Sequence, residues 1–177
     1  VQKKGAPTSN PPTTATLNFN NSMRVKNSGV FYSKDDDQKD RYWLKLVSPS
    51  NVANTMLVGY VPGATDGFEQ DFDAESFGMS SDLFYSVMDD KKLLIQGKSN
   101  FRTEDKIILG ANFFSSESYT ISLMTTERIF ANGQTIYLKD TQTGIITNLS
   151  QGNYTFAANA GESTGRFEII YRPETVL

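Results

Sequence analysis

The amino-acid sequence predicts an all-β fold, an antiparallel jelly-roll-like β-sandwich of about ten strands. The clearest strand is Arg41-Tyr-Trp-Leu-Lys-Leu46, in which Tyr42, Leu44 and Leu46 point to one face and the other three residues to the opposite face. Short apolar segments recur along the chain with turn residues between them, and no segment has a convincing helical pattern. Because parallel strands are usually joined by crossover helices, we expect mainly antiparallel pairing.

The expected elements follow from the N-terminus. Residues 1–16 are predicted to be an N-terminal arm or edge loop, because residues 5–16 are rich in Pro, Thr and Ser and proline cannot donate a ladder hydrogen bond. Residues 17–177 are predicted to be the β-sandwich domain. Its strands are expected at 17–19 with a continuation at 23–25, and then at 30–32, 41–47, 55–61, 83–88, 93–96, 107–109, 119–123, 135–138, 145–149, 154–156 and 166–171.

The connections between these strands differ in character. Residues 89–92, Asp-Asp-Lys-Lys, are predicted to join strands 83–88 and 93–96 in a β-hairpin. Residues 159–165 are rich in glycine and are predicted to be a loop. Residues 64–78 form a long connection with many acidic and aromatic side chains, and they are therefore the best place to look for chemistry.

A second acidic segment, residues 34–40, partly resembles a calcium loop. Asp35 and Asp37 match the first two ligand positions of an EF-hand loop, but Lys39 stands at the third. Asp40 occupies the position that requires glycine, so this segment is expected to be a solvated loop.

The composition excludes several classes of function. The chain has no histidine and no cysteine, which excludes Ser-His-Asp and Cys-His catalysis, disulfide bonds, and metal sites built on histidine or thiolate. The net charge is −3 and no basic segment dominates, which argues against nucleic-acid binding. No apolar run approaches the ~20 residues of a membrane helix. Paired carboxylates could serve a glycosidase, but sequence spacing does not place two of them across one cleft. We therefore predict no enzyme.

The acidic loop is a candidate for a calcium site. Its candidate ligands are Asp66, Glu69, Asp71 and Asp73, and a loop can supply carboxylate and carbonyl oxygens together. The alternative is a loop that covers the sheet edge, with its aromatic side chains inward and its acidic side chains in water. We prefer this alternative, so no cofactor is predicted, with calcium as the one candidate ion.

The second candidate site is the outward face of the strand at 41–47. Trp43 is the only tryptophan of the chain and lies between Arg41 and Lys45, so it could stack on a sugar or contact a partner. Alternatively, Trp43 packs beneath a neighbouring loop or a second domain, while Arg41 and Lys45 form cross-strand ion pairs. We prefer the packing interpretation. Further along the chain, Arg166 follows a strand pattern and either pairs with a carboxylate such as Glu168 or extends into solvent.

Several motifs in a fixed order point to a known family. They are the segments 19–25 (FNNSMRV), 41–46 (RYWLKL), 57–61 (LVGYV) with 64–67 (ATDG), 94–97 (LIQG), 119–122 (YTIS), 136–140 (IYLKD), 153–156 (NYTF) and 165–169 (GRFEI). Their order resembles the β-rich domain near the C-terminus of large secreted and cell-surface proteins of Bacteroidetes. That domain commonly stands just before the type IX secretion sorting domain. The resemblance covers about residues 17–171.

This resemblance implies an extracellular, non-catalytic module that acts as a stalk, spacer or adhesion domain. It implies export across the outer membrane by components of the type IX translocon, and a surface glycan or another cell-surface protein as a partner. Family members are often adhesins, including those of gliding bacteria. The resemblance also implies that Val1–Lys4 is the end of a truncated strand and that the chain is an excerpt of a longer protein. Finally, it places Trp43 within a structural hallmark of the domain and so favours packing over ligand binding.

Overall fold

A computed structural model describes residues 38–78 and 82–173 of the chain. All of them belong to the unit Asp35–Leu177. The predicted arm at residues 1–16, its boundary at residue 17 and the strands predicted at 17–25 and 30–32 lie outside the described residues.

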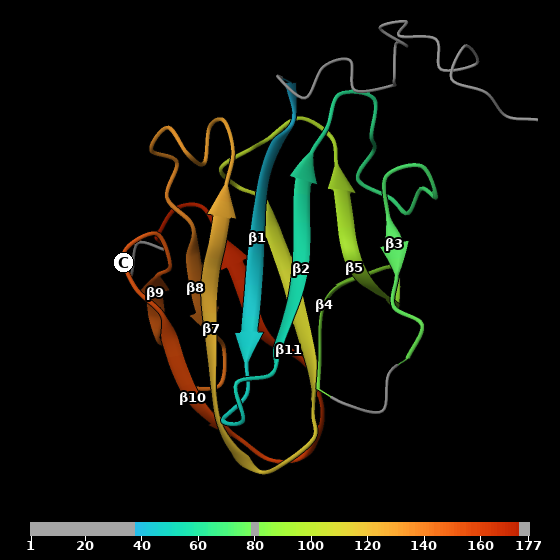
Figure 1. Ribbon diagram of the computed structural model, residues 1–177. Coiled ribbons are helices and arrows are strands. Elements are labelled where there is room, and N and C mark those ends of the chain that lie inside the picture. Colours follow the sequence, from blue (N-terminus) through green and yellow to red (C-terminus); the bar gives the residue numbers. More distant parts are fainter. Residues whose placement is uncertain (1–37, 79–81, 174–177) are drawn as a thin grey trace, which may run out of the picture. The chain divides into compact units, whose positions relative to one another are not determined.

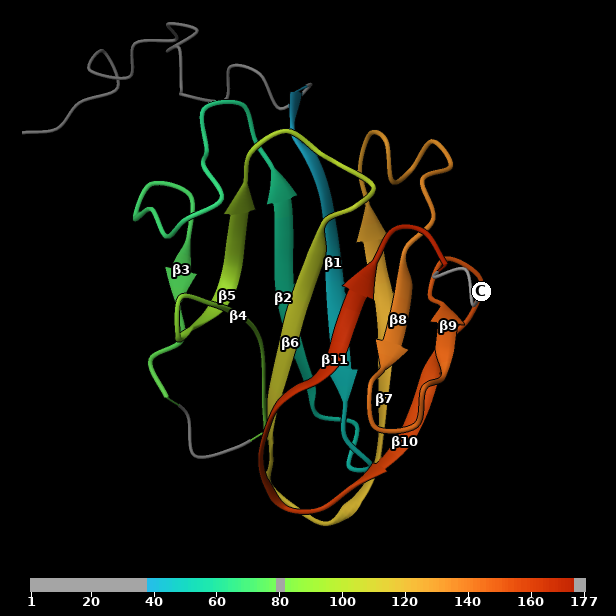
Figure 2. The same ribbon diagram turned by 180° about the vertical axis from the view of Figure 1, so that it is seen from behind.

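The described residues contain eleven strands. They are β1 (Asp40–Val47), β2 (Ala53–Tyr60), β3 (Ala74–Glu75), β4 (Leu83–Met88), β5 (Lys91–Lys98), β6 (Lys106–Phe113), β7 (Glu117–Thr126), β8 (Tyr137–Asp140), β9 (Ile146–Asn148), β10 (Tyr154–Ala158) and β11 (Gly161–Ile170). Figure 1 shows β7, β1, β2, β5 and β3 in the nearer layer, and Figure 2 shows β6, β11, β8 and β9 in front when seen from behind. The hydrogen-bonded order is β10-β7-β1-β2-β5-β4-β6-β11-β8-β9, with β3 beside β5. The prediction of an all-β, sandwich-like fold is confirmed.

One strand pair departs from the expected antiparallel pattern. β2 and β5 run parallel, with Leu57 opposite Ile95 and Gly59 opposite Gly97. The prediction assumed that a parallel pair would need a crossover helix. Here the chain instead crosses between β2 and β5 through the loop at 61–73 and strands β3 and β4. Because strands β3 and β4 make this crossover, the lack of a helical pattern in the sequence did not exclude a parallel pair.

The hairpin predicted at 89–92 is confirmed between β4 and β5. Ser86, Val87 and Met88 pair antiparallel with residues 91–93. Asp89 and Asp90 have φ angles of 50° and 61°. Positive φ at both central residues of a two-residue turn suits the right-handed twist of the flanking strands, and aspartate tolerates it better than most residues.

The loop predicted at 159–165 is wrong for most of its length, because β11 already begins at Gly161. Residues 161–164 pair with residues 110–113 of β6, and the register shifts between Thr164 and Phe167. Gly165, with a φ of 77°, lies within this shift. A β-bulge that requires left-handed backbone explains a glycine inside a strand.

The core lies between the two layers, and the alternation in β1 places its residues there. Tyr42, Leu44 and Leu46 are fully buried. Each buried leucine contributes about 1.5–3 kcal/mol relative to an exposed one. Tyr42 belongs to an aromatic cluster whose other members are Tyr60, Phe101, Phe130 and Tyr171.

Three hydroxyl groups of this cluster share hydrogen bonds. The Tyr42 and Tyr171 oxygens are 2.8 Å apart, and the Tyr60 hydroxyl donates to Tyr171 at 3.0 Å. These bonds satisfy polar groups that burial would otherwise leave without partners. Burial raises the pKa of all three phenols well above the ordinary value.

Side chains connect β10, at one end of the strand order, to β8 and β11 near the other end. The Arg166 guanidinium donates to Asp140 Oδ2 at 2.8 Å and to the Ala157 carbonyl at 3.1 Å. Its Cζ lies 4.9 Å and 4.8 Å from the ring centroids of Phe156 and Phe167. Arg166 therefore pairs with Asp140, and neither Glu168 nor solvent is its main partner.

Among the described residues, no helix has the length and apolar character needed to cross a membrane.

Candidate functional site

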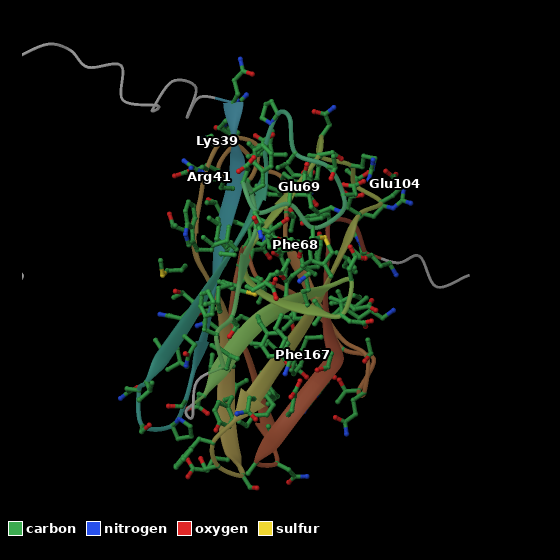
Figure 3. All side chains as sticks on the ribbon, turned by 90° about the vertical axis from the view of Figure 1, so that its right-hand side faces the viewer. Lys39, Arg41, Phe68, Glu69, Glu104 and Phe167 are labelled. Carbon is green, nitrogen blue, oxygen red and sulfur yellow. The ribbon has the colours of Figure 1, made fainter. Side chains whose placement is uncertain are left out.

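The residues predicted to carry a binding site lie on the outward surface of β1. Arg41, Trp43 and Lys45 are all half-buried there, in alternation with the core residues. Figure 3 shows Arg41 and Lys39 on the side of β1 that faces away from the β6 and β11 layer, whereas Phe167 lies between the layers. We use the term Trp43 face for the outward surface of β7, β1, β2 and β5 around Trp43.

Register places Trp43 in a row that crosses four strands. Its neighbours are Thr125 on β7 and Leu57 on β2, and Leu57 is next to Ile95 on β5. Ile95 is 40% exposed, which is high for a large apolar side chain on a sheet. The row therefore presents an aromatic ring and two aliphatic side chains side by side on the surface.

The two cations beside Trp43 have different surroundings. The Arg41 guanidinium lies over the Trp43 ring, with its Cζ 5.6 Å from the ring centroid, and it forms an ion pair with Glu127. This pair agrees with the packing interpretation. Lys45 lies between Thr55 of β2 and Ser122 of β7. In the part of the chain that the structure describes, Lys45 has no carboxylate partner.

A groove of about 230 Å³ runs beside the Trp43 row. Its floor is formed by Gly59 and Gly97, which lie opposite each other in the parallel pair. Because neither has a side chain, the sheet surface is hollow at this point. Arg41 and Phe72 form opposite walls, and Leu57, Val61, Ile95, Lys39, Asp71 and Gln96 complete the lining.

The Phe72 wall is held by a side chain that the sequence suggested as a metal ligand. Asp73 is 91% buried, and its two oxygens accept hydrogen bonds from the Gly97 N–H at 2.8 Å and the Glu69 N–H at 2.7 Å. A Cβ on Gly97 would lie 2.6 Å from Phe72 Cβ. Glycine at position 97 is thus required for the close approach of the loop to β5.

The remaining acidic residues of the loop also contact the protein. Asp66 binds Arg102 at 2.7 Å, Ser99 at 2.8 Å and Lys98 at 3.2 Å, and the hydrogen bonds from Arg102 and Ser99 lower the pKa of its carboxyl group. Glu69 accepts the N–H of Thr65 at 2.6 Å.

Asp71 is exposed at the rim of the groove and takes no part in the hydrogen bonds that Asp66, Glu69 and Asp73 form. No group of three or more acidic side chains in residues 38–78 and 82–173 is arranged to hold a metal ion. The calcium site stays a prediction without a cluster to support it.

The sequence interpretation missed the groove itself. Gly59 was a visible signal, because a glycine within a strand suggests a bulge or a close approach of backbone. Its pairing with Gly97 depends on the parallel register of β2 and β5, and local patterns carry no information about it. Phe72 was expected to face inward as part of a covering loop, and it does lie against the sheet, where it forms a wall of the groove.

Comparison with protein families matches residues 6–171 to a family described as Domain of unknown function (DUF8693). The chain belongs to this family. The match includes the Trp43 face and the Asp140–Arg166 pair. No curated protein and no solved structure matches the chain.

Proposed function

We propose that this domain is a non-catalytic extracellular module of a larger type IX secretion cargo protein, in which it acts as an adhesion domain, stalk or spacer. The ordered motifs from residue 17 to residue 171 and the all-β fold support this role. The absence of histidine and cysteine from the sequence supports a non-catalytic role, since it removes the commonest nucleophile and base pairs. The partners in this proposal are translocon components during export, and a glycan or a surface protein afterwards.

The Trp43 face is the observation that favours adhesion over a purely spacing role. A row of one half-buried aromatic ring, the half-buried Leu57 and the exposed Ile95 lies beside a groove and is bordered by Arg41 and Lys45, and this is the composition of a contact surface. Such surfaces gain most of their binding energy from a few aromatic and arginine side chains at the centre. A spacer has no need of this arrangement on its outward face.

Deletion of residues 38–173 from the parent protein tests the proposal. We expect loss of attachment or of surface display, with any enzymatic activity of the parent retained. Trp43→Ala in the intact parent separates the two roles, because an adhesion module loses attachment while a spacer keeps both attachment and display. Normal attachment and display after the deletion would refute the proposal.

A carbohydrate-binding module is the second candidate, and the Trp43 row favours it. Sugar rings present apolar faces that stack on aromatic side chains, and their hydroxyl groups bond to polar groups at the rim. A glycan array probed with the 177-residue chain tests this candidate directly. No binding, or binding that Trp43→Ala leaves unchanged, would rule it out.

A further inference from the structure

We infer that the Trp43 face binds an acidic polysaccharide, with one sugar ring stacked on the side of the Trp43 ring that Arg41 does not cover and a sugar carboxylate beside Lys45. This inference rests on the proposed adhesive function and adds the chemical class of the ligand.

The charge of the Trp43 face favours an anionic ligand. Arg41 is paired with Glu127, and the groove has one cation and one anion in Lys39 and Asp71. Lys45 is then the cation in excess, since no carboxylate of the described residues pairs with it. The chain as a whole has a net charge of −3, so a surface with excess positive charge is the exception. An ammonium group beside an aromatic ring suits a carboxylate attached to a stacked ring.

The polar groups around Lys45 can bond to a sugar. Thr55 on β2 lies opposite Lys45 and is exposed, and Thr125 on β7 lies opposite Trp43 and is also exposed. Side chains two residues apart on one strand are separated by about 6.7 Å. A ring stacked on Trp43 therefore brings its substituents within reach of both Lys45 and the threonine hydroxyls.

The direction of the apolar row favours a polymer over a single sugar. Trp43, Leu57 and Ile95 lie in register on three adjacent strands. Strands are about 4.8 Å apart, so this row extends about 10 Å across the sheet. The groove over Gly59 and Gly97 lies two positions further along β2 and β5 and shares Leu57 and Ile95 with the row, so it gives room for the edge of the neighbouring rings. An elongated chain that crosses the strands uses both features together.

The test uses the 177-residue chain with two probes, polygalacturonate as the acidic polymer and laminarin as a neutral glucan. Trp43 is the only tryptophan, so tryptophan fluorescence reports on this face alone. We expect polygalacturonate to change the emission and to protect Trp43 from acrylamide quenching, and to bind at least about tenfold more tightly than laminarin. Higher salt should weaken the binding, because exposed charges are screened.

Four variants, measured by affinity electrophoresis, locate the contact. Trp43→Ala should weaken binding of polygalacturonate about thirtyfold, and Lys45→Gln about five- to tenfold. Gly59→Val fills the groove floor, since a Cβ there lies 3.4 Å from Arg41 Cγ, and should weaken binding about tenfold. Lys106→Gln removes a cation from β6 in the other layer and should leave binding within about twofold. Circular dichroism of each variant confirms that it is folded.

The outcomes separate this inference from the proposed function. Equal affinity for the two polymers, or a Lys45→Gln variant that binds as the wild type does, overturns the acidic ligand but leaves an adhesive role intact. If neither polymer changes the acrylamide quenching of Trp43 fluorescence, the inference as a whole is overturned, and this result requires no variant. The deletion experiment on the parent protein tests the adhesive role independently.

Discussion

Removing one partner of the Asp140–Arg166 pair should strongly destabilise the fold, and Asp140→Asn tests this. The Asp140 side chain is fully buried and the Arg166 side chain is 14% exposed. Asparagine keeps the shape of aspartate but leaves the guanidinium without its counter-charge. Removing one partner of a buried ion pair typically costs about 3–5 kcal/mol, and the small residual exposure of Arg166 places this case near the lower value. We expect a loss of about 3 kcal/mol in the free energy of unfolding.

The loss should be visible in thermal and urea unfolding. A chain of this size loses about 3 °C of melting temperature for each kcal/mol, so Asp140→Asn should melt about 9 °C lower than the wild type. Glu162→Gln is the matched control, because Glu162 lies on β11, the strand of Arg166, and pairs with Lys92, with both side chains nearly half exposed. That exposed pair should contribute less than about 1 kcal/mol. Equal effects of the two substitutions would refute the argument.

The pH dependence gives a second measurement of the same pair. Burial alone would raise the pKa of Asp140, but hydrogen bonds from Arg166, Tyr154 and the Gln142 N–H outweigh it and lower that pKa. A carboxyl group with a lowered pKa in the fold stabilises the protein above its unfolded pKa of about 3.9 and loses this contribution as the pH falls further. The stability difference between wild type and Asp140→Asn should therefore shrink below about pH 4. A constant difference from pH 7 to pH 3 would contradict this assignment.

Three other predictions follow from the geometry. Gly97→Ala should destabilise the fold by about 1–3 kcal/mol, because its Cβ would overlap Phe72, and limited proteolysis should then cut the loop at 64–78 faster; an unchanged cleavage rate would contradict this. Burial raises the pKa of Tyr85 to about 12, so ultraviolet titration should show this phenol ionising above pH 11. Because the unfolded chain already ionises at about pH 10, the free energy of unfolding should fall as the pH rises from about 10 towards 12. Ionisation of all eight tyrosines near pH 10 would refute this prediction. Calcium should change the melting temperature by less than about 1 °C relative to chelator, because Asp66, Glu69 and Asp73 already bind protein groups; a clear rise would support the calcium site.

Local patterns predicted the elements whose determinants are local. The alternation in residues 41–46 predicted the correct face for every residue of that strand. A strand with one face in the core has apolar side chains at every second position. The hairpin at 89–92 was predictable because two aspartates tolerate positive φ. The first half of β11 was not, because Gly, Ser and Thr dominate residues 161–165 and resemble a loop. In that segment pairing with β6 overrides local preference.

Neither the Asp140–Arg166 pair nor the groove could be predicted from the sequence, and the reason is the same for both. Both depend on residues that are distant in sequence and are brought together by strand order. Arg166 has Glu168 two residues away, yet the buried partner comes from β8 because β8 and β11 are neighbours in the sheet. A search for the nearest opposite charge in sequence therefore selects the wrong carboxylate.

The groove shows how strand register, more than residue type, creates the candidate site. The outward position of Trp43 follows from alternation alone, and on that basis packing under a loop was the simpler interpretation. The parallel pairing of β2 with β5 sets Gly59 opposite Gly97 and removes two side chains from the surface beside the Trp43 row. Asp73 then fixes Phe72 at the far wall by binding the Gly97 N–H. A one-residue slip of β5 would turn Gly97 to the core face and fill the groove with a side chain. The same register that completes the sheet thus determines whether this face can hold a ligand.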